Sequence, residues 1–354
     1  MVIINVIDLV IVSILLWWVI TDISMADNIK NRYTWTIIIT IIVILAEMGC
    51  SVTDNTIADN RIWSQIFNVI GFSLTPFILL IESNRNENRV RRLWVYLPAV
   101  VNAIFTVLSP LTGFIFFVSE DSTYSRGKLF PVFLTAFLFS VAISMYNKVY
   151  SVRNMPNHFV QRIIITNVIM LGGVTIQVFI PDVYVTWLTI SIYLLLNYTI
   201  SCETASMIDA LTKLINRMGF NKMMSDIKPS RRGITALFMM DVNDLKEIND
   251  EKGHIVGDYY LKKSAEVLRE TFGTKSKIFR FGGDEFCVLL YTESEERVSE
   301  YMNILDAKIK KMQKKDPVFP GLAAGYFVLD GRDIREVIDK ADEMMYENKR
   351  ASKS

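Results

Sequence analysis

Three carboxylates stand at the ends of predicted strands in the C-terminal part of the chain. Residues 233–242 form a continuous apolar run of strand length that closes at Asp241. Two further apolar runs, 277–281 and 286–291, are joined by a Gly-Gly-Asp-Glu tetrapeptide at 282–285, which predicts a β-hairpin. If this hairpin lies beside the first strand, the acidic side chains converge at one edge of a sheet.

The residue types at this edge suit metal-assisted chemistry on phosphates. Asp241, Asp284 and Glu285 offer the oxygen ligands that Mg²⁺, or the similar Mn²⁺, prefers. Gly282 and Gly283 carry no side chains, so a phosphate could approach the backbone there. Phosphoryl or nucleotidyl transfer follows from such a site. The same tetrapeptide is also common in ordinary surface turns, so spacing alone leaves both interpretations open.

The order of the predicted elements indicates an α/β or α+β domain with one central sheet. The spacing of apolar residues predicts the helices and the strands of this domain. In chain order these are a helix over 203–225, the strand 233–242, a helix over 256–272, the hairpin, a helix over 294–315, a strand over 318–329 and a helix over 332–350.

Four segments, in the right order and with the right spacing, resemble the motifs of the GGDEF-domain diguanylate cyclases. Residues 280–286 resemble the motif that defines the family, and residues 209–217 its opening motif. Residues 241–258 resemble its metal and base-recognition segment, and residues 341–349 its closing helix. Four matching motifs are far more specific than one tetrapeptide.

The resemblance implies an α/β palm-like, nucleotidyl cyclase-like fold for 201–354 and a reaction between two GTP molecules. Each 3′-hydroxyl attacks the α-phosphate of the other GTP, which gives cyclic di-GMP and two pyrophosphates. Because each domain holds one GTP, two domains must face each other, so a homodimer is the expected working form.

The resemblance also implies roles for individual residues. Asp241, Asp284 and the Val242 carbonyl would be metal ligands, and Glu285 would support the second metal ion. Asp284 would also accept the proton of the 3′-hydroxyl. The residues implied to contact GTP are Asn249 and Asp258 at the guanine edge, His254 near the nucleotide, Gly282 and Gly283 beside the phosphates, and Lys246, Lys349 and Lys353 as phosphate-neutralising cations. By itself, His254 is more often a turn residue, and Asn249 could merely cap a helix.

Four positions depart from the family pattern or lack one of its features. Lys353 stands where a phosphate-binding arginine is usual, so the charge is kept and the bidentate geometry is lost. Asn243 stands where aspartate is common, although the family also uses asparagine. Gly273 and Ser276 occupy the positions of an Arg-x-x-Asp inhibitory site that many relatives carry. Product inhibition through that site is therefore not expected, whereas Asp258 predicts selective use of GTP.

The first 200 residues have a different composition from the rest. The chain has 354 residues, a net charge of +1 and 51% hydrophobic residues, but 23 charged residues fall in 1–200 and 52 in 201–354. This contrast predicts a multi-pass transmembrane domain, surrounded by membrane lipid, over 1–200 and a soluble domain over 201–354. The even charge balance excludes a nucleic-acid binder driven by charge. Seven apolar stretches are long enough to span a bilayer: 2–20, 34–52, 63–82, 93–118, 129–147, 163–182 and 183–200. The last two could instead form one re-entrant segment.

The distribution of basic residues predicts the orientation of this domain. The loops 21–33, 83–92 and 148–162 hold nine Lys and Arg residues, and the alternating loops hold three. Such an excess marks cytoplasmic loops, so the N-terminus lies outside and the C-terminal domain lies in the cytoplasm of a bacterial cell. Asp8 and Glu47 then fall toward the outer side. They could line a pocket for an extracytoplasmic ligand, or each could sit near a helix end and reach interfacial water.

The sequence as a whole predicts a membrane-bound diguanylate cyclase regulated by a seven-helix sensor. A short link at about 197–208 would transmit a helix movement to the dimer. One alternative is a catalytically inactive GGDEF receptor that binds GTP or cyclic di-GMP, which the intact Asp241, Asp284 and Glu285 disfavour. Another is a transporter or channel with a regulatory nucleotide domain, which the lack of a charged intramembrane pathway disfavours.

Overall fold

The computed structural model describes residues 2–23, 25–53, 60–83, 89–180, 183–225, 234–273, 276–292, 294–329 and 332–351. The chain divides into two compact units. One comprises Met1–Arg153 with Asn157–Glu203, and the other comprises Asn154–Pro156 with Thr204–Ser354.

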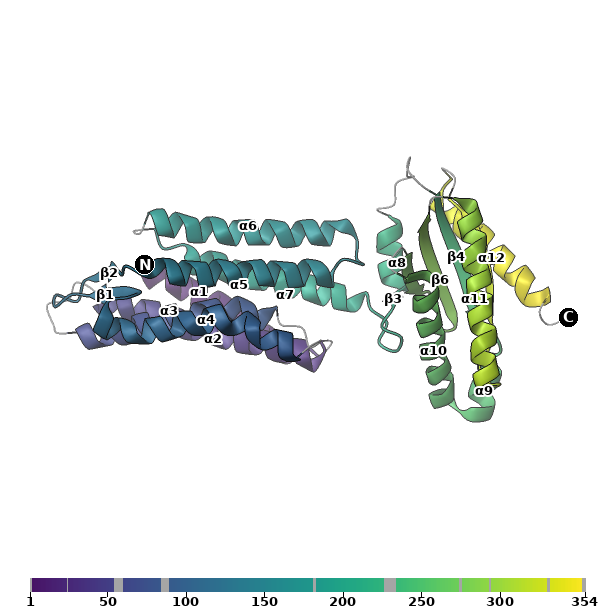
Figure 1. The fold of residues 1–354 in the computed structure, drawn as a ribbon, viewed down its shortest axis with the longest axis horizontal. Helices are drawn as coiled ribbons and strands as arrows, with labels where there is room; N and C mark the ends of the chain where they lie inside the picture. Colours follow the sequence, from purple (N-terminus) through teal and green to yellow (C-terminus); the bar gives the residue numbers. More distant parts are fainter. Residues whose placement is uncertain are drawn as a thin grey trace. The chain divides into compact units, whose positions relative to one another are not determined.

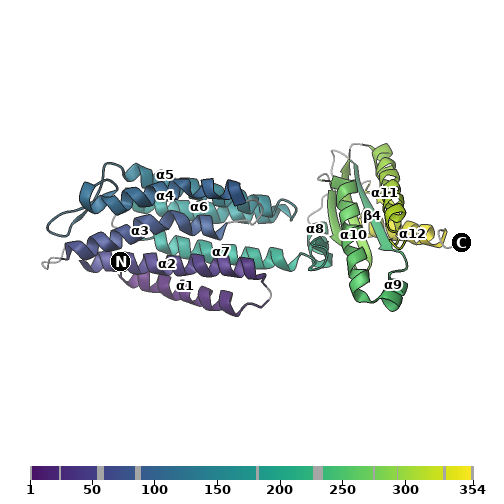
Figure 2. The ribbon, with the colours of Figure 1, turned by 60° about the horizontal axis from the view of Figure 1, so that its bottom comes forward.

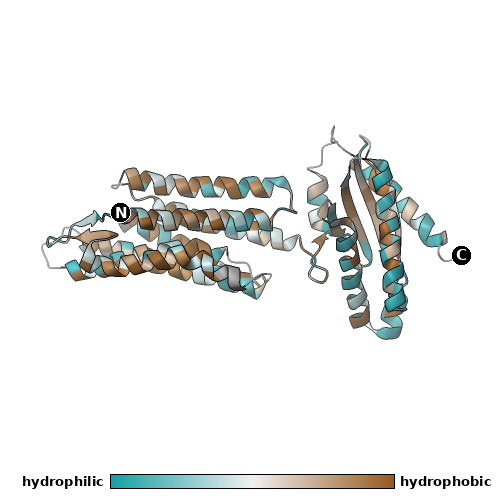
Figure 3. Cartoon of the chain, viewed as in Figure 1, coloured by the Kyte–Doolittle hydropathy of each residue, from teal (hydrophilic) through white to brown (hydrophobic). Residues whose placement is uncertain are grey.

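The N-terminal unit is a bundle of helices that run alongside one another (Figures 1 and 2). Its described residues form seven helices, as expected from the sequence: α1 (Val2–Thr21), α2 (Asp27–Thr53), α3 (Arg61–Glu82), α4 (Arg89–Thr112), α5 (Phe130–Ser151), α6 (Asn157–Phe179) and α7 (Thr186–Ser206). Among the described residues six of them, α1 to α6, are long and apolar enough to cross a membrane, whereas the predicted seventh span, 183–200, forms a helix, α7, that is not among these candidates. Figure 3 shows hydrophobic residues along these helices, and large apolar side chains such as Trp17 and Leu93 face outward, as lipid contact requires.

One predicted span has different limits in the structure, and the question of whether the last two are separate is answered. The stretch 93–118 is not one helix, because α4 ends at Thr112 and Gly113 adopts a positive φ of 65°. A glycine in this left-handed conformation ends a helix at little steric cost. The chain then forms a hairpin of β1 (Phe116–Val118) and β2 (Tyr124–Arg126). The stretches 163–182 and 183–200 are two separate helices, α6 and α7, rather than one re-entrant segment.

The C-terminal unit is built on a five-stranded sheet, among the residues described, with the order β3-β5-β6-β4-β7. The β3–β5 pair is parallel and the other pairs are antiparallel. The elements of this unit are β3 (Ile215–Asn216), α8 (Arg217–Met224), β4 (Ile234–Val242), α9 (Leu245–Lys252), α10 (His254–Phe272), β5 (Ser276–Arg280), β6 (Glu285–Thr292), α11 (Glu295–Lys315), β7 (Leu322–Val328) and α12 (Ile334–Ala351).

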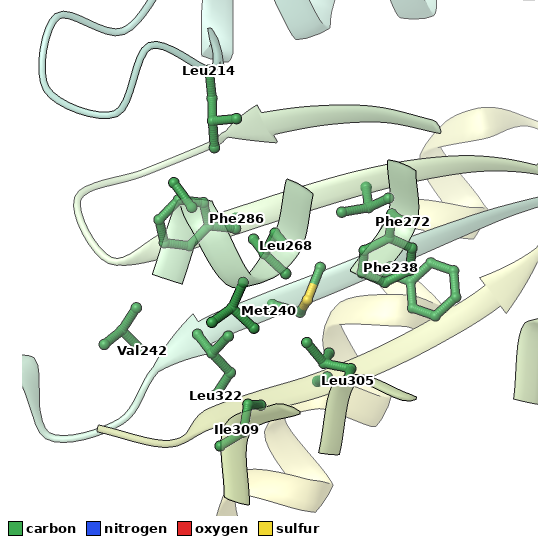
Figure 4. Close-up of a cluster of buried hydrophobic side chains, with 14 of the residues drawn as sticks. Leu214, Phe238, Met240, Val242, Leu268, Phe272, Phe286, Leu305, Ile309 and Leu322 are labelled. Atoms are coloured by element: carbon green, nitrogen blue, oxygen red, sulfur yellow. The ribbon is translucent and has the colours of Figure 1, made fainter. Parts of the chain in front are cut away.

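Helices cover both faces of this sheet, because side chains along a strand point alternately to its two faces. Phe238 and Met240 of β4 pack with Leu268 of α10 and Leu305 of α11 on one face (Figure 4). Leu237 and Met239 of β4 pack on the other face, against buried residues of α8 and α12. The central strand is therefore buried on both sides and holds its two ends in fixed positions.

The helix predicted over 203–225 is wrong. The chain leaves α7 after Ser206, and the Asp209 carboxylate accepts hydrogen bonds from the Thr212 backbone N–H at 2.7 Å and hydroxyl at 2.6 Å. Lys213 has a φ of 58°, and the Asn216 side chain accepts from Gly219 N at 3.0 Å to begin α8. These hydrogen bonds pair the local backbone groups in a non-helical conformation. The segment therefore does not form the helix that its apolar spacing indicates. The other predicted elements of this unit agree with the structure to within a few residues, and the strand β3 and the helix α9 were not predicted.

Candidate active site

The register between β4 and β6 places the predicted carboxylates at one end of the sheet. Asp241 of β4 is the register partner of Glu285 of β6. The Val242 backbone N–H donates to the Asp284 carbonyl at 3.0 Å, which fastens the hairpin tip to the end of β4. Burial raises the pKa of the Glu285 carboxyl, and the negative charges of Asp284, Asp342 and Asp241 add to the shift. The site is thus a concentration of negative charge that favours a cation.

The turn of the hairpin depends on its first glycine. The backbone N–H groups of Phe281 and Gly282 both donate to the Glu285 carbonyl, at 2.8 and 3.2 Å. A Cβ atom at Gly282 would lie 2.4 Å from Oε2 of Glu285, so any larger residue would displace that carboxylate. Gly283 is exposed, and a Cβ there would meet nothing within 4 Å. The tip therefore leaves open space beside the backbone for a phosphate.

Arg280 connects the hairpin tip to the opening motif. Its Nη2 and Nε donate to the Gly283 carbonyl at 2.7 and 3.2 Å, and its Nη1 donates to the two carboxylate oxygens of Asp209 at 3.1 and 3.2 Å. Burial alone would raise the pKa of Asp209, but hydrogen bonds from Thr212 and Arg280 hold it below its ordinary value. The sequence alone predicted no individual role for Arg280 or Asp209. Their only signal was their presence in two of the motifs.

Lys349 of α12 reaches the acidic cluster. Its Nζ lies 2.5 Å from Oδ1 of Asp241, so the two side chains form an ion pair. The predicted phosphate contact of Lys349 would require it to turn from Asp241 toward the substrate. Asp342, on the same helix, was missed as a contributor to the charge at Glu285. Its place in the closing motif was the available signal.

The donor set fits Mg²⁺ or Mn²⁺. Within the described parts of the chain, no three His, Cys, Asp or Glu side chains form a ready-made metal cage. The groups that lie at the hairpin are all oxygen donors: Asp241, Asp284, Glu285 and the Val242 carbonyl. Mg²⁺ is usually bound by one or two carboxylates together with substrate phosphates and water. Such a partial set of protein ligands is therefore compatible with this metal.

A second part of the candidate site lies where α9 turns into α10. Gly253, with a φ of 83°, makes the turn and donates its N–H to the Asn249 carbonyl at 2.9 Å. A Cβ at Gly257 would lie 2.0 Å from Oδ1 of Asn249, so this glycine lets the amide pack against α10. The Oδ1 atom is buried and accepts no hydrogen bond within the chain. Asp258 follows directly on α10 and is exposed. An unsatisfied acceptor beside a free carboxylate suits the N–H groups of guanine.

The remaining residues predicted to contact GTP lie outside the hairpin and the turn between α9 and α10, or outside the described residues. Lys246 on α9 and His254 at the start of α10 are both exposed. Lys353 lies outside the described residues. Gly273 ends α10 at a φ of 60°, and the Ser276 hydroxyl donates to the Gly273 carbonyl at 3.1 Å.

Known proteins resemble the C-terminal part of this chain. Residues 206–354 match the family model described as "Diguanylate cyclase, GGDEF domain". The chain is 34% identical over 152 residues to the diguanylate cyclase DgcP of Pseudomonas aeruginosa, covering 41% of this chain and 23% of that protein. It is 30% identical over 154 residues to the diguanylate cyclase DosC of Escherichia coli, covering 41% of this chain and 34% of that protein. The chain thus spans about a quarter to a third of the length of these curated relatives.

Among solved structures, the GGDEF domain of DgcB from Caulobacter crescentus, determined in complex with c-di-GMP, aligns with 41% of this chain and 91% of its own. The sequence identity is 22% and the TM-score is 0.38.

The C-terminal unit is an α/β domain of the palm-like, nucleotidyl cyclase-like class. Residues 206–354 belong to the GGDEF domain family of the diguanylate cyclases. They follow a helical N-terminal module with six candidate membrane spans.

Proposed function

We propose that the chain is a membrane-bound diguanylate cyclase, which condenses two GTP molecules into cyclic di-GMP and releases two pyrophosphates. The observation that carries this proposal is the pairing of Asp241 with Glu285 across β4 and β6, beside a Gly-Gly turn, in a GGDEF domain. A receptor that only binds nucleotides would have no need of so much negative charge at its phosphate site.

The residues at the hairpin have distinct tasks in this reaction. Bound Mg²⁺ or Mn²⁺ would neutralise the triphosphate and lower the pKa of the 3′-hydroxyl. Asp241, Asp284, Glu285 and the Val242 carbonyl would hold the metal ions, and Asp284 accepts the hydroxyl proton. The 3′-oxygen then bonds to the α-phosphorus of the other GTP, and the bond from that phosphorus to the departing pyrophosphate breaks. The same step occurs a second time, with the roles of the two GTP molecules exchanged.

The surrounding residues bind and orient the nucleotide. Asn249 and Asp258 contact the guanine edge, and His254 lies near the nucleotide. Gly282 and Gly283 allow the phosphates to approach the hairpin backbone. Lys246, Lys349 and Lys353 offset the phosphate charge. Because one domain holds one GTP, catalysis takes place in a homodimer in which two such sites face each other.

The N-terminal module anchors the enzyme in the bacterial cell membrane and regulates it. We place its N-terminus outside and the GGDEF domain in the cytoplasm, from the bias of Lys and Arg among the loops. The domains would then be 1–200, a sensor in membrane lipid, and 201–354, the cyclase.

The contacts of α7 support a regulatory role for that helix. The Tyr198 hydroxyl donates to Asp22 at 2.7 Å, the Ser201 hydroxyl lies 2.9 Å from that of Tyr33, and Glu203 pairs with Arg162. Three other parts of the module thereby hold the helix that continues to Ser206, just before the GGDEF motifs begin. A change in the module can reach the domain through this helix, as a shift between productive and unproductive dimers.

The test uses the full-length protein in nanodiscs with Mg²⁺ and GTP, followed by quantification of cyclic di-GMP and pyrophosphate. The account predicts two pyrophosphates for each cyclic di-GMP, with ATP a poor substitute for GTP. GTP binding without turnover, unchanged when the domains are forced to dimerise, would favour the inactive receptor instead. Equal turnover of ATP would contradict the assignment of Asp258.

A further inference from the structure

Polar side chains of three helices lie toward one end of the N-terminal bundle. Asp8 lies in the second turn of α1, and Glu47 lies near the end of α2. The Gln177 side chain, from the last turn of α6, donates to Glu47 Oε1 at 3.5 Å and accepts from the Thr186 backbone N–H of α7 at 3.0 Å. Gln177 therefore connects the Glu47 carboxylate to the first turn of α7.

Asp8 and its neighbour on α1, Asn5, are buried and form no hydrogen bond through the atoms named below. Asp8 is 0% exposed, and neither of its carboxylate oxygens accepts a hydrogen bond. Asn5, one turn earlier on α1, is 1% exposed, and its Nδ2 donates to nothing. None of the ion pairs among the described residues includes Asp8 or Glu47, although the charges of these two residues are close enough to interact. A buried, uncompensated carboxylate is strongly unfavourable, so the group as it stands lacks a binding partner.

We propose that this group, Asn5, Asp8, Glu47 and Gln177, binds a small ammonium-bearing molecule from the extracytoplasmic side. An ammonium supplies the missing positive charge and three N–H donors for the carboxylate oxygens. The free Nδ2 of Asn5 is a donor, so the same molecule carries an acceptor, such as a hydroxyl, next to its ammonium. Glu47, unlike Asp8, is only half-buried.

The chemistry of the group favours an ammonium over a bare metal ion. An unpartnered N–H donor such as that of Asn5 faces a metal ion unfavourably. The two carboxylates and one amide donor instead match a molecule with both a cationic donor and a neutral acceptor.

Occupancy of this group would reach the output helix through Gln177. A cation that attracts the Glu47 carboxylate changes the bond from Gln177, and Gln177 also holds the first backbone N–H of α7. This regulatory consequence rests on the proposed cyclase function, whereas the binding itself does not. The two can therefore be tested separately on the same samples.

Binding is tested by thermal unfolding of the full-length protein in nanodiscs, with methylammonium and ethanolamine as probes and NaCl, MgCl₂ and CaCl₂ at matched ionic strength. Saturating ethanolamine is expected to raise the unfolding midpoint by about 2–4 °C, and methylammonium by less. The near-isosteric variants Asp8→Asn and Glu47→Gln should lose this shift. The control Asp27→Asn, an exposed change at the other end of α2, should keep it.

Three outcomes would overturn the binding proposal. They are no shift with either ammonium probe, an equal shift in Asp8→Asn and wild type, and a shift with metal ions alone.

Regulation is tested by the rate of cyclic di-GMP formation in the same samples. Ethanolamine should change the wild-type rate by at least about fivefold and leave the rate of Asp8→Asn unchanged. A midpoint shift with no change in rate would overturn the regulatory link. The absence of product in every sample would count against the proposed cyclase and leave the midpoint result valid.

Discussion

The guanidinium of Arg280 holds Asp209 with one nitrogen, at 3.1 Å, and the Gly283 carbonyl with the others, at 2.7 and 3.2 Å. The hairpin tip is therefore fixed to the segment through which the chain enters the domain. Arg280 contacts none of the proposed metal ligands through these bonds, so its effect on the reaction is to position the tip.

Arg280→Lys should lower kcat by about 10- to 100-fold with little change in the KM for GTP. A lysine keeps the charge, but it lacks the planar guanidinium that bonds Asp209 and the Gly283 carbonyl at the same time. Steady-state kinetics of the full-length protein measure this. Arg332→Lys is the matched control, since Arg332 is exposed just before α12 and contacts Glu336 at 3.9 Å and the Phe327 ring rather than any residue of the proposed site. A variant at position 280 with wild-type kcat would show that the tip is positioned without this arginine.

Gly257→Ala should raise the KM for GTP by about tenfold. The added methyl would lie 2.0 Å from Oδ1 of Asn249 and push this amide out of the proposed guanine site, which removes about one hydrogen bond. Gly172→Ala, in a helix of the membrane module where a Cβ meets nothing within 4 Å, controls for the added methyl. An unchanged KM would place the guanine elsewhere.

The central elements of the C-terminal domain could be predicted from the sequence because their signals are local. The apolar run before Asp241 is buried on both faces of the sheet, and Gly282-Gly283 marks a turn between two strands. The register that joins Asp241 to Glu285 follows once these strands are neighbours.

The errors arose where side-chain bonds or long-range contacts decide the structure. Leu211 and Leu214 have helical spacing, yet the bonds of Asp209 to Thr212 end the helical path. The pairing of Lys349 with Asp241 joins residues 108 positions apart, and no local pattern encodes it. The end of α4 was predictable from Gly113, which the length of the apolar run obscured.

Added cyclic di-GMP should leave the initial rate unchanged at micromolar concentration. The positions of the family's inhibitory arginine and aspartate hold Gly273 and Ser276, and neither can form the charge-assisted bonds that hold the product phosphates. Initial rates at fixed GTP, with and without added product, make the measurement. A sharp fall in rate would reveal an inhibitory site at other residues.

A flexible Gly-Ser insertion after Glu203 should abolish the response to any signal from the membrane module while preserving basal turnover. The insertion interrupts α7 beyond its contacts with Asp22, Tyr33 and Arg162 and before the GGDEF motifs. An insertion of equal length in the hairpin loop at Asp121 is the control, because that loop lies far along the chain from α7. A response that survives the insertion at Glu203 would mean that α7 is not the route.

The central claim is that the carboxylates at the β4–β6 junction carry out the condensation, and Asp284→Asn tests it most directly. Cyclic di-GMP formation by wild type and Asp284→Asn is compared in nanodiscs at saturating Mg²⁺ and GTP, with the exposed change Asp306→Asn as control. The account predicts that Asp284→Asn loses at least about a hundredfold in rate and remains folded and dimeric, while Asp306→Asn is unaffected. Product formation by Asp284→Asn at the wild-type rate would contradict it.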